Sequence, residues 1–205
     1  MNSREHWDRH YASRPDHQLG WYEPHLRISL EWIDGLGLTA DAPIIDAGGG
    51  ASTLVDDLLD RGYRALTVAD LSAEALSRVK ARLGERAGQV TWHCGDMTTM
   101  LLSAAHYALW HDRAVFHFLT TADAQQRYRN QLLQALAPDG HLILATFAPE
   151  APPRCSGLPV QRYDPQTLEK VLGKAFGPIR YRKQLHLTPG GIEQMYLYSL
   201  FRRSP

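Results

Sequence analysis

Four polar side chains that could take part in chemistry follow one short apolar stretch. His111, Asp112, Arg113 and His117 come after residues 106–110, which the sequence predicts to be a buried strand. The carboxyl end of a central strand in an open parallel sheet is where ligands bind. A histidine or a carboxylate at that place could accept a proton from an amine or a hydroxyl. The alternative is structural, with Asp112 and Arg113 forming an ion pair and the histidines capping helix ends.

A glycine-rich turn earlier in the chain is a second candidate site. The apolar residues 43–45 lead into Asp46-Ala47 and then into Gly48-Gly49-Gly50, and a helical pattern follows. This order predicts a buried strand, a tight turn and a helix N-terminus. Glycines let the backbone bend sharply and let a bound group approach it closely. The helix amides would then point at the bound group. The alternative is a turn without any ligand.

A second predicted strand also ends in an acid. Asp70 closes the strand expected over 66–70, 20 residues after Gly50. A carboxylate at that distance within one strand–helix–strand unit can accept hydrogen bonds from ribose hydroxyls. It could also be no more than a helix-entry residue, since Ser72 is expected to cap the following helix.

The positions of these residues depend on an alternation of strands and helices along the whole chain. Helices are predicted over residues 3–12, 25–33, 54–61, 73–83, 124–136 and 165–172, and strands over 43–47, 66–70, 89–94, 106–110, 141–147, 179–187 and 193–201. The Pro-Gly-Gly sequence between the last two strands predicts a hairpin connection.

Two segments outside this alternation are candidates for contacting a substrate. The first 37 residues include Trp7, Tyr11, Trp21 and Tyr22, and they could close over a bound molecule or simply cover the sheet edge. Residues 148–162 are rich in proline and glycine and contain Arg154 and Cys155. We expect Cys155 to be a pocket wall rather than a nucleophile, because no group that would activate it is visible.

The overall composition limits the function classes. The 205 residues suffice for one domain, and we expect a lid segment over 1–37 and a catalytic core over 38–205. Basic and acidic residues number 22 each, for a formal net charge of +0, which gives no footprint for nucleic acid or a membrane surface. Two cysteines form neither a disulfide framework nor a metal cluster. These features favour a cytoplasmic protein without a metal.

Several motifs resemble those of the class I methyltransferases that use S-adenosylmethionine (SAM). The acid-x-Gly-x-Gly order of Asp46 to Gly50 resembles their first motif. Gly95-Asp96-Met97 is similar to their third motif, in which an acid binds the adenine amino group and the next residue packs on the ring. The Pro138–Gly140 turn and the final strand pair also match. The resemblance implies an α/β fold, Rossmann-like and doubly wound, with a seven-stranded sheet that is mostly parallel and has an antiparallel C-terminal hairpin.

The resemblance also implies roles for individual residues, with SAM as cofactor and S-adenosylhomocysteine as product. The expected cofactor-binding residues are Asp46, Ala47, Gly48, Gly49, Gly50, Asp70, Leu71, Ser72, Gly95, Asp96, Met97 and His111. The expected catalytic residues are Asp112, His111 and His117. The expected substrate-binding residues are Trp21, Tyr22, Arg113, Arg154 and Cys155.

The methyl acceptor stays open at this point. The chain resembles the thiopurine, thiol and tellurite methyltransferases, and it also resembles the lysine methyltransferases of elongation factor or citrate synthase. We predict a small-molecule thiol, amine or hydroxyl acceptor, and the alternative is a protein lysine. A non-catalytic SAM- or nucleotide-binding protein is a further alternative. Thr53 stands where a nicotinamide-binding fingerprint would have its third glycine, which argues against a nicotinamide oxidoreductase.

Overall fold

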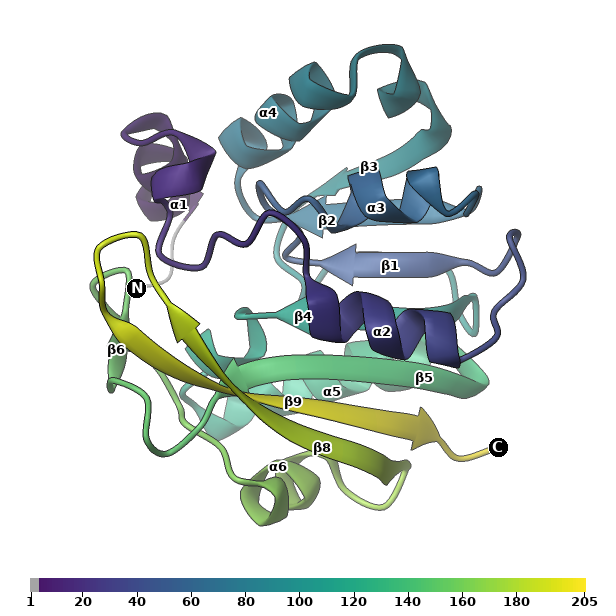
Figure 1. Ribbon diagram of the computed structural model, residues 1–205. Coiled ribbons are helices and arrows are strands. Elements are labelled where there is room, and N and C mark those ends of the chain that lie inside the picture. Colours follow the sequence, from purple (N-terminus) through teal and green to yellow (C-terminus); the bar gives the residue numbers. More distant parts are fainter. Residues whose placement is uncertain (1–3) are drawn as a thin grey trace.

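The fold is organised around one seven-stranded sheet, and Figure 1 shows its strands from β3 at one edge to β8 at the other. The structure is a computed structural model that describes residues 4–205. The strand order is β3-β2-β1-β4-β5-β9-β8. The first five strands of this order run parallel, and β9 runs antiparallel to both of its neighbours, β5 and β8. The strands are β1 (Ile44–Ala47), β2 (Leu66–Asp70), β3 (Val90–Cys94), β4 (Tyr107–Arg113), β5 (Leu136–Phe147), β8 (Phe176–Leu187) and β9 (Glu193–Arg203), and a separate small hairpin pairs β6 (Arg154–Cys155) with β7 (Leu158–Pro159). The predicted fold class is confirmed.

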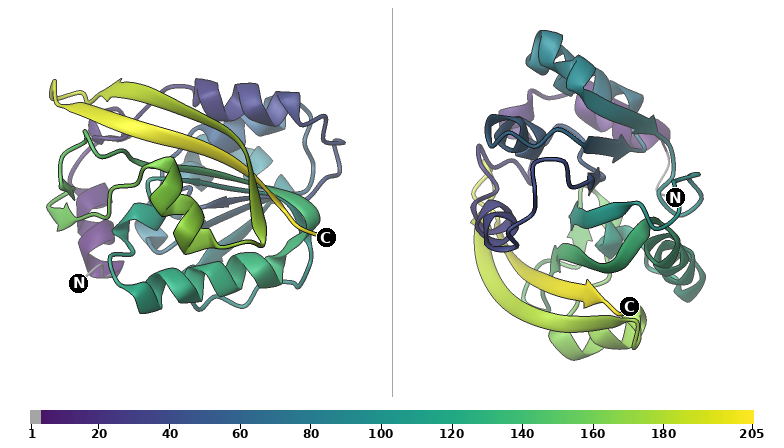
Figure 2. Two further views of the ribbon diagram at one scale, coloured as in Figure 1. Left: turned by 90° about the horizontal axis from the view of Figure 1, so that it is seen from below. Right: turned by 90° about the vertical axis from the view of Figure 1, so that its right-hand side faces the viewer.

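Helices cover both faces of this sheet, as the two turned views in Figure 2 show. They are α1 (Arg4–Ala12), α2 (Arg27–Gly35), α3 (Leu54–Asp60), α4 (Ala73–Leu83), α5 (Ala122–Ala135) and α6 (Pro165–Leu172). One hydrophobic cluster joins α2, α3 and α4 to one face, and a second joins α5 and α6 to the other. The chain therefore has the three-layer arrangement expected of strands that alternate with helices.

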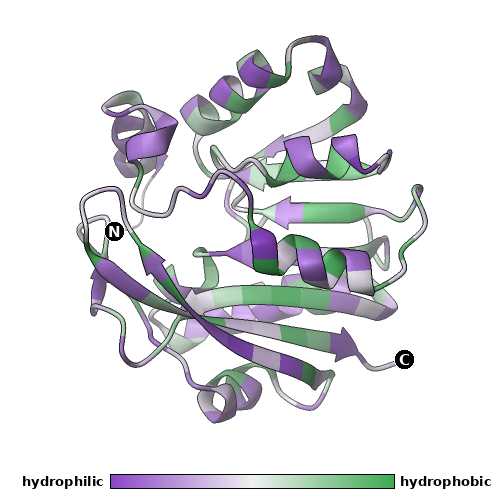
Figure 3. Cartoon of the chain, in the orientation of Figure 1, coloured by the Kyte–Doolittle hydropathy of each residue, from purple (hydrophilic) through white to green (hydrophobic). Residues whose placement is uncertain are grey.

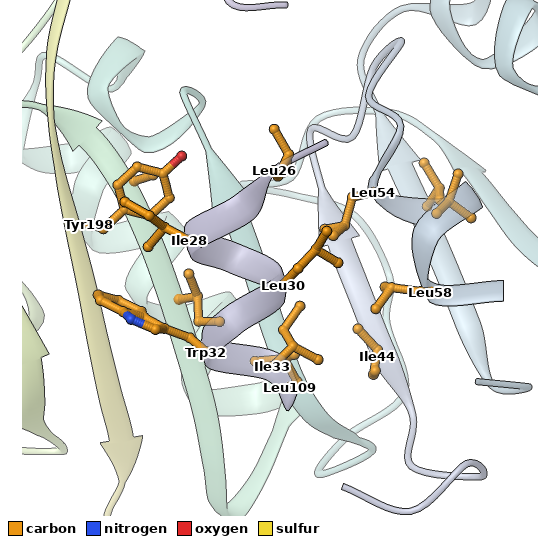
Figure 4. Close-up of a cluster of buried hydrophobic side chains, with 14 of the residues drawn as sticks. Leu26, Ile28, Leu30, Trp32, Ile33, Ile44, Leu54, Leu58, Leu109 and Tyr198 are labelled. Atoms are coloured by element: carbon orange, nitrogen blue, oxygen red, sulfur yellow. The ribbon is translucent and has the colours of Figure 1, made fainter. Parts of the chain in front are cut away.

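Strand β1 carries a polar residue, Asp46, next to its carboxyl end. Side chains alternate between the two faces of a strand, so Ile44 packs under α2 and α3 while Ile45 packs under α5. Figure 4 shows Ile33 of α2 and Leu58 of α3 beside Ile44 in the first cluster. In Figure 3 the body of β1 is hydrophobic and its carboxyl end is polar. That polar end is Asp46, which the cluster leaves at the edge of the core.

Local sequence signals set the helix ends. Ser72 accepts a hydrogen bond from the Ala75 amide, as predicted, and Thr121 does the same for α5. Asp164 and Thr167 form a reciprocal capping box at the start of α6. The N-terminal helix was expected from residue 3. It begins at Arg4 in the structure, and residue 3 lies outside the described part of the chain.

Three predicted boundaries were wrong in ways that matter for the site. The strand expected to end at Trp110 continues to Arg113, because the ladder to β5 still pairs Asp112 with Leu144 and Arg113 with Ala145. The strand expected from residue 141 starts at Leu136. The segment 148–162 is not only a loop, since it contains the β6–β7 hairpin.

The N-terminal segment crosses the carboxyl ends of the parallel strands, where α1 and the turn of the β8–β9 hairpin also lie (Figure 1). The Ser72 hydroxyl donates to the Asp8 carboxylate of α1 at 2.6 Å. Arg78 of α4 donates to the Arg14 carbonyl at 2.7 Å and pairs with Asp16. These contacts hold α1 over the ends of β1 and β2.

Candidate active site

A cavity of about 270 Å³ lies at the carboxyl ends of the parallel strands. The glycine turn after β1 and the acids after β2 and β3 form one part of its lining. Residues from the N-terminal segment and from the chain after β4 form another part. The sequence therefore places most of its candidate residues around one space.

The glycine turn has no room for larger side chains. Gly48 has φ +73°, and a Cβ atom there would overlap the Val115 side chain. A Cβ atom on Gly49 would lie 2.7 Å from Oδ2 of Asp46 and 2.8 Å from Val68. The Gly48 amide donates to the Ala69 carbonyl at 2.7 Å. Ala47, which precedes the turn, is fully buried. The turn is thus packed tightly on its sheet side, and Gly48 and Gly49 line the cavity.

Asp70 faces the same space from the end of β2. Its Oδ1 accepts a hydrogen bond from the Ser72 amide at 2.7 Å. Burial raises the pKa of Asp70 to about 7, although the amides of Ser72 and Gly50 oppose that shift. Leu71 also lines the cavity. A ligand that donates hydrogen bonds to such a buried carboxyl would stabilise its ionised form.

The third predicted motif also lies on the cavity wall. Gly95, Asp96 and Met97 all line it. Asp96 accepts a hydrogen bond from the Thr98 amide at 2.8 Å, which fixes its carboxylate at the start of the turn. The Met97 side chain is buried in the cluster under α5.

A chain of buried hydrogen bonds starts at Asp46. Nδ1 of His111 lies 2.7 Å from Oδ1 of Asp46, and Nε2 of the same ring lies 2.8 Å from the Ser29 hydroxyl. The ring of His111 therefore links Asp46 at the end of β1 to Ser29 of α2. His111 lines the cavity, but both of its nitrogens are engaged.

The guanidinium of Arg113 is engaged in every direction that the structure records. It donates to the Tyr198 hydroxyl at 3.0 Å, to the Trp21 carbonyl at 2.7 Å and to Glu23 at 2.8 Å. Its plane also lies over the Tyr196 ring, at 4.6 Å from the centroid. Arg113 lines the cavity, yet its charge is balanced by Glu23.

The other two predicted catalytic residues are placed differently from the expectation. Asp112 is fully buried and accepts hydrogen bonds from the amides of Val115 and Phe116 and from the Tyr128 hydroxyl. Burial raises the pKa of Asp112 to about 6, and these donors oppose the shift. Among the described residues that line the cavity, Asp112 does not appear. It holds the turn after β4 in shape.

His117 lies in the core rather than at the site. Its Nδ1 accepts from the Phe147 amide at 3.2 Å, and its ring contacts the rings of Phe118 and Phe147. Burial, with the Arg113 charge as a second cause, lowers the pKa of His117 to about 3, so the ring is neutral. It too is missing from the cavity lining that residues 4–205 provide.

Some of the predicted substrate-binding residues line the cavity and one does not. Trp21, Tyr22 and Cys155 line the cavity. Burial raises the pKa of Cys155 to about 11, so its thiol is neutral and suits a wall. Arg154 is exposed, donates to the Gly157 carbonyl within its own hairpin, and does not contribute to the lining that the structure describes.

Aromatic rings dominate the part of the cavity that the N-terminal segment closes. The Trp7 ring lies 5.8 Å from that of Trp21 and 5.1 Å from that of Phe118, in edge-to-face arrangements. Tyr11 lies 5.8 Å from Trp21. The four-residue spacing of Trp7 and Tyr11 indicated one shared helix face, and both were expected in a segment that closes over a bound molecule or covers the sheet edge. Phe118 was not predicted from the sequence.

Four further residues were also missed. Ser29, Glu23, Tyr198 and His186 lie in the polar contacts around Arg113 and His111. Each looks ordinary in its own segment, and only the tertiary fold brings it to the site.

The comparisons with known proteins agree with this geometry. Residues 44–140 match a protein family described as a methyltransferase domain. No curated protein matches the chain.

Solved structures match over most of the chain at low identity. A protein connected with the conversion of a disulfide bond into a thioacetal group during echinomycin biosynthesis is 17% identical, with a TM-score of 0.77, covering 98% of this chain and 91% of that chain. A SAM-dependent methyltransferase from Anabaena variabilis is 14% identical, with a TM-score of 0.73 and coverage of 99% and 96%. The Burkholderia thailandensis 1,6-didemethyltoxoflavin-N1-methyltransferase, with its substrate and S-adenosylhomocysteine bound, is 22% identical, with a TM-score of 0.68 and coverage of 88% and 78%.

Two further findings concern residues 4–205. Within them, no helix is both long enough and apolar enough to span a bilayer. In the same range, no three His, Cys, Asp or Glu side chains converge as metal ligands would.

Proposed function

Starting from the match of residues 44–140 to a methyltransferase domain, we propose that the protein is a SAM-dependent enzyme that methylates a small molecule whose nucleophile needs no base from the enzyme. The observation that carries this proposal is that the polar side chains on β4 and in the turn after it are already hydrogen-bonded within the protein. His111 and Asp112 have their acceptor atoms hydrogen-bonded inside the protein, and Nδ1 of His117 accepts from a backbone amide. None of the three presents a free lone pair to the cavity as these contacts stand.

The cofactor half of the cavity suits SAM. When bound, SAM supplies a methyl group on a positively charged sulfur that is a good leaving group. We propose that Asp70 accepts hydrogen bonds from the ribose hydroxyls and that Asp96 and Met97 contact the adenine. The close-packed glycines 48–50 and the carboxylate of Asp46 would hold the remaining part.

The acceptor half suits a planar and largely apolar molecule. Trp7, Trp21 and Phe118 supply ring faces and edges, and such rings pack well against another aromatic system. Arg113 and Glu23 neutralise each other at one side of this space. One structural relative carries bound 1,6-didemethyltoxoflavin, a small molecule, which supports an acceptor of that size.

The chemistry left to the chain is positioning. An ionised thiol or an amine that already has a free lone pair can attack the methyl group once it is held at the right distance and angle. The ring wall excludes water from the reacting atoms. A hydroxyl acceptor would need its proton removed, and the polar side chains after β4 do not offer a free acceptor for it.

The two other readings have less support. For a protein-lysine acceptor, Asp112 could have served as an acid at the end of β4, but it is hydrogen-bonded to Val115, Phe116 and Tyr128. A non-catalytic SAM-binding protein would have no need for a chamber beside the cofactor half. The division into a lid over 1–37 and a core over 38–205 stays a prediction, although α2 packs within the main core.

The test has a binding step and a transfer step. Calorimetric titration with SAM and with S-adenosylhomocysteine is expected to give saturable binding of both. Transfer from radiolabelled SAM is then measured with a panel of aromatic thiols, aromatic amines and phenols, with an unfolded lysine-rich protein as the fourth substrate. We expect labelled thiols or amines. Transfer to the protein alone would contradict the proposal, and so would SAM binding without transfer to any member of the panel.

A further inference from the structure

A second buried polar cluster lies where the β8–β9 hairpin meets the N-terminal segment. His186 is near the end of β8, and its side chain is 6% exposed. Its Nδ1 lies 3.2 Å from Oε1 of Glu23, and its Nε2 lies 2.8 Å from the Gly20 carbonyl oxygen. One imidazole therefore contacts two points of the segment Gly20–Glu23, which we call the cover segment.

Both partners of this ring are hydrogen-bond acceptors. Burial alone would raise the pKa of Glu23, but the hydrogen bond from His186 and the charge of Arg113 lower it below its usual value. Glu23 is thus a carboxylate, and the carbonyl of Gly20 can only accept. Both contacts are satisfied together when each ring nitrogen of His186 carries a hydrogen.

Arg113 holds the cover segment from the other side. It donates to the same oxygen of Glu23 and to the Trp21 carbonyl. The cover segment therefore contacts Arg113 of β4 on one side and His186 of β8 on the other. The hairpin is close at this point, since a Cβ atom on Gly20 would lie 4.0 Å from the Thr188 methyl group.

The cover segment forms part of the cavity wall. Trp21, Tyr22 and Glu23 line the cavity, whereas His186 is absent from the lining that the described residues form. His186 holds the cover segment directly, and its ring also lies 5.9 Å from the ring of Tyr196, over which Arg113 lies. The cofactor half is formed by the ends of β1, β2 and β3, which His186 does not contact in the recorded interactions.

We infer that His186 is a positioning residue for the acceptor: it holds the cover segment closed, and so places Trp21 as a wall of the acceptor half. This inference rests on the proposed function for its substrate, but the closed segment itself can be measured without any turnover. It assigns the C-terminal hairpin a role in acceptor binding in addition to its place in the sheet.

Hydrogen exchange of the cover segment, with the protein saturated in S-adenosylhomocysteine, tests this inference. The Tyr22 amide donates to the Leu19 carbonyl at 3.0 Å, so opening of the segment exposes a protected amide. We expect His186→Ala to speed exchange in a peptide spanning residues 19–24 by about tenfold or more. His186→Gln keeps a donor of similar reach, so it should restore part of the protection. Leu187→Ala changes the next residue of β8, whose side chain is 62% exposed, and should leave exchange within about twofold of the wild type.

A positioning role and a merely structural role of His186 predict different results. If His186 positions the cover segment, then in His186→Ala the Kd for S-adenosylhomocysteine and the exchange of β5 should stay within about twofold of the wild type. With 4-nitrobenzenethiol as the acceptor probe, we expect KM to rise about tenfold and kcat to stay within about twofold. Unchanged exchange in residues 19–24 would overturn the inference, and so would faster exchange that spreads to β5 together with weaker cofactor binding. A wild-type protein that transfers no methyl group would contradict the proposed function instead, because the exchange result does not depend on transfer.

Discussion

The two halves of the cavity are built in different ways. The half that we propose for the cofactor comes from the turns after β1, β2 and β3, where acids and glycines adjoin in sequence the strands that place them. The acceptor half comes from α1, the cover segment, the chain after β4 and the β6–β7 hairpin, which are far apart in the sequence. The first half is charged and tightly packed on its backbone, and the second is aromatic with its charges paired.

This difference separates two tasks. In the proposed cofactor site, the turn after β2 is fixed by a buried strand and by the Ser72 cap of α4, and the glycines after β1 are packed against Asp46, Val68 and Val115. An acceptor site that is assembled from distant segments depends on contacts that hold those segments together, such as the Arg113–Glu23 pair. Substitutions in the two halves should therefore produce different kinetic signatures, with cofactor binding lost in one and acceptor binding in the other.

The largest effect is expected in the cofactor half, at Gly48. Gly48→Ala forces an alanine into φ +73° and drives its Cβ atom into Val115, which costs several kcal/mol of strain and overlap. SAM affinity should fall by about 100-fold or more, measured by calorimetry. The matched control is Gly88→Ala, because Gly88 has open space around its Cβ position. Retained SAM affinity in Gly48→Ala would mean that this turn is not part of the cofactor site.

Asp70 should give the next effect, again in cofactor binding alone. Asp70→Asn should weaken SAM by about 1–3 kcal/mol, the range for lost hydrogen bonds to a buried charged group. The wild type should also bind SAM more tightly as the pH rises through about 7, the pKa of Asp70. The sign follows because hydroxyl donors prefer the ionised carboxylate, which predominates above that pH.

Titrations at about pH 6 and about pH 8 check this second part. The Asp70→Asn variant serves as the control, since it has no carboxyl at this position and its affinity should change less between the two pH values. Equal pH dependence in both proteins would assign the titrating group elsewhere.

Trp21 tests the acceptor half. Trp21→Ala removes a ring from the wall, and we expect the acceptor KM to rise about tenfold while the Kd for SAM stays within about twofold. Trp21→Phe keeps a ring and should recover most of the loss. An equal loss of SAM affinity in Trp21→Ala would erase the distinction between the two halves.

The smallest effect is expected at His117, which the account places in the core. His117→Gln should lower the free energy of unfolding by about 1 kcal/mol, because the Phe147 amide contact is altered, and should leave kcat/KM within about threefold. Denaturant unfolding and steady-state kinetics measure the two quantities. A 100-fold fall in kcat with unchanged stability would restore His117 as a catalytic residue.

The same contrast explains what the sequence could predict. Asp46 and Asp70 were placed at strand ends by local patterns, because a short apolar run followed by an acid and glycine or a helix cap defines its own geometry. Asp96 was placed by the resemblance of Gly95-Asp96-Met97 to a family motif. Asp112 and His117 were misplaced because local pattern does not tell whether a polar side chain faces a cavity or a backbone amide. Their partners, Tyr128 and Phe147, come from α5 and β5.

Ser29 and His186 could not be predicted for a related reason. Ser29 is one polar residue on an otherwise apolar helix face, and His186 is one of several polar residues on an edge strand. Only the packing of α2 against β4, and of the hairpin against the cover segment, gives each of them its partner.

The most direct test of the central claim is the pH dependence of kcat for transfer from SAM to 4-nitrobenzenethiol, measured at saturating SAM from about pH 6 to about pH 9. This thiol is ionised over that range, so an enzyme that contributes no base should give a flat profile in the wild type and in His117→Gln. A kcat that falls tenfold per pH unit on the acid side would contradict the account, above all if the fall disappeared in His117→Gln, because it would show that transfer requires an ionisable group of the enzyme in its deprotonated form.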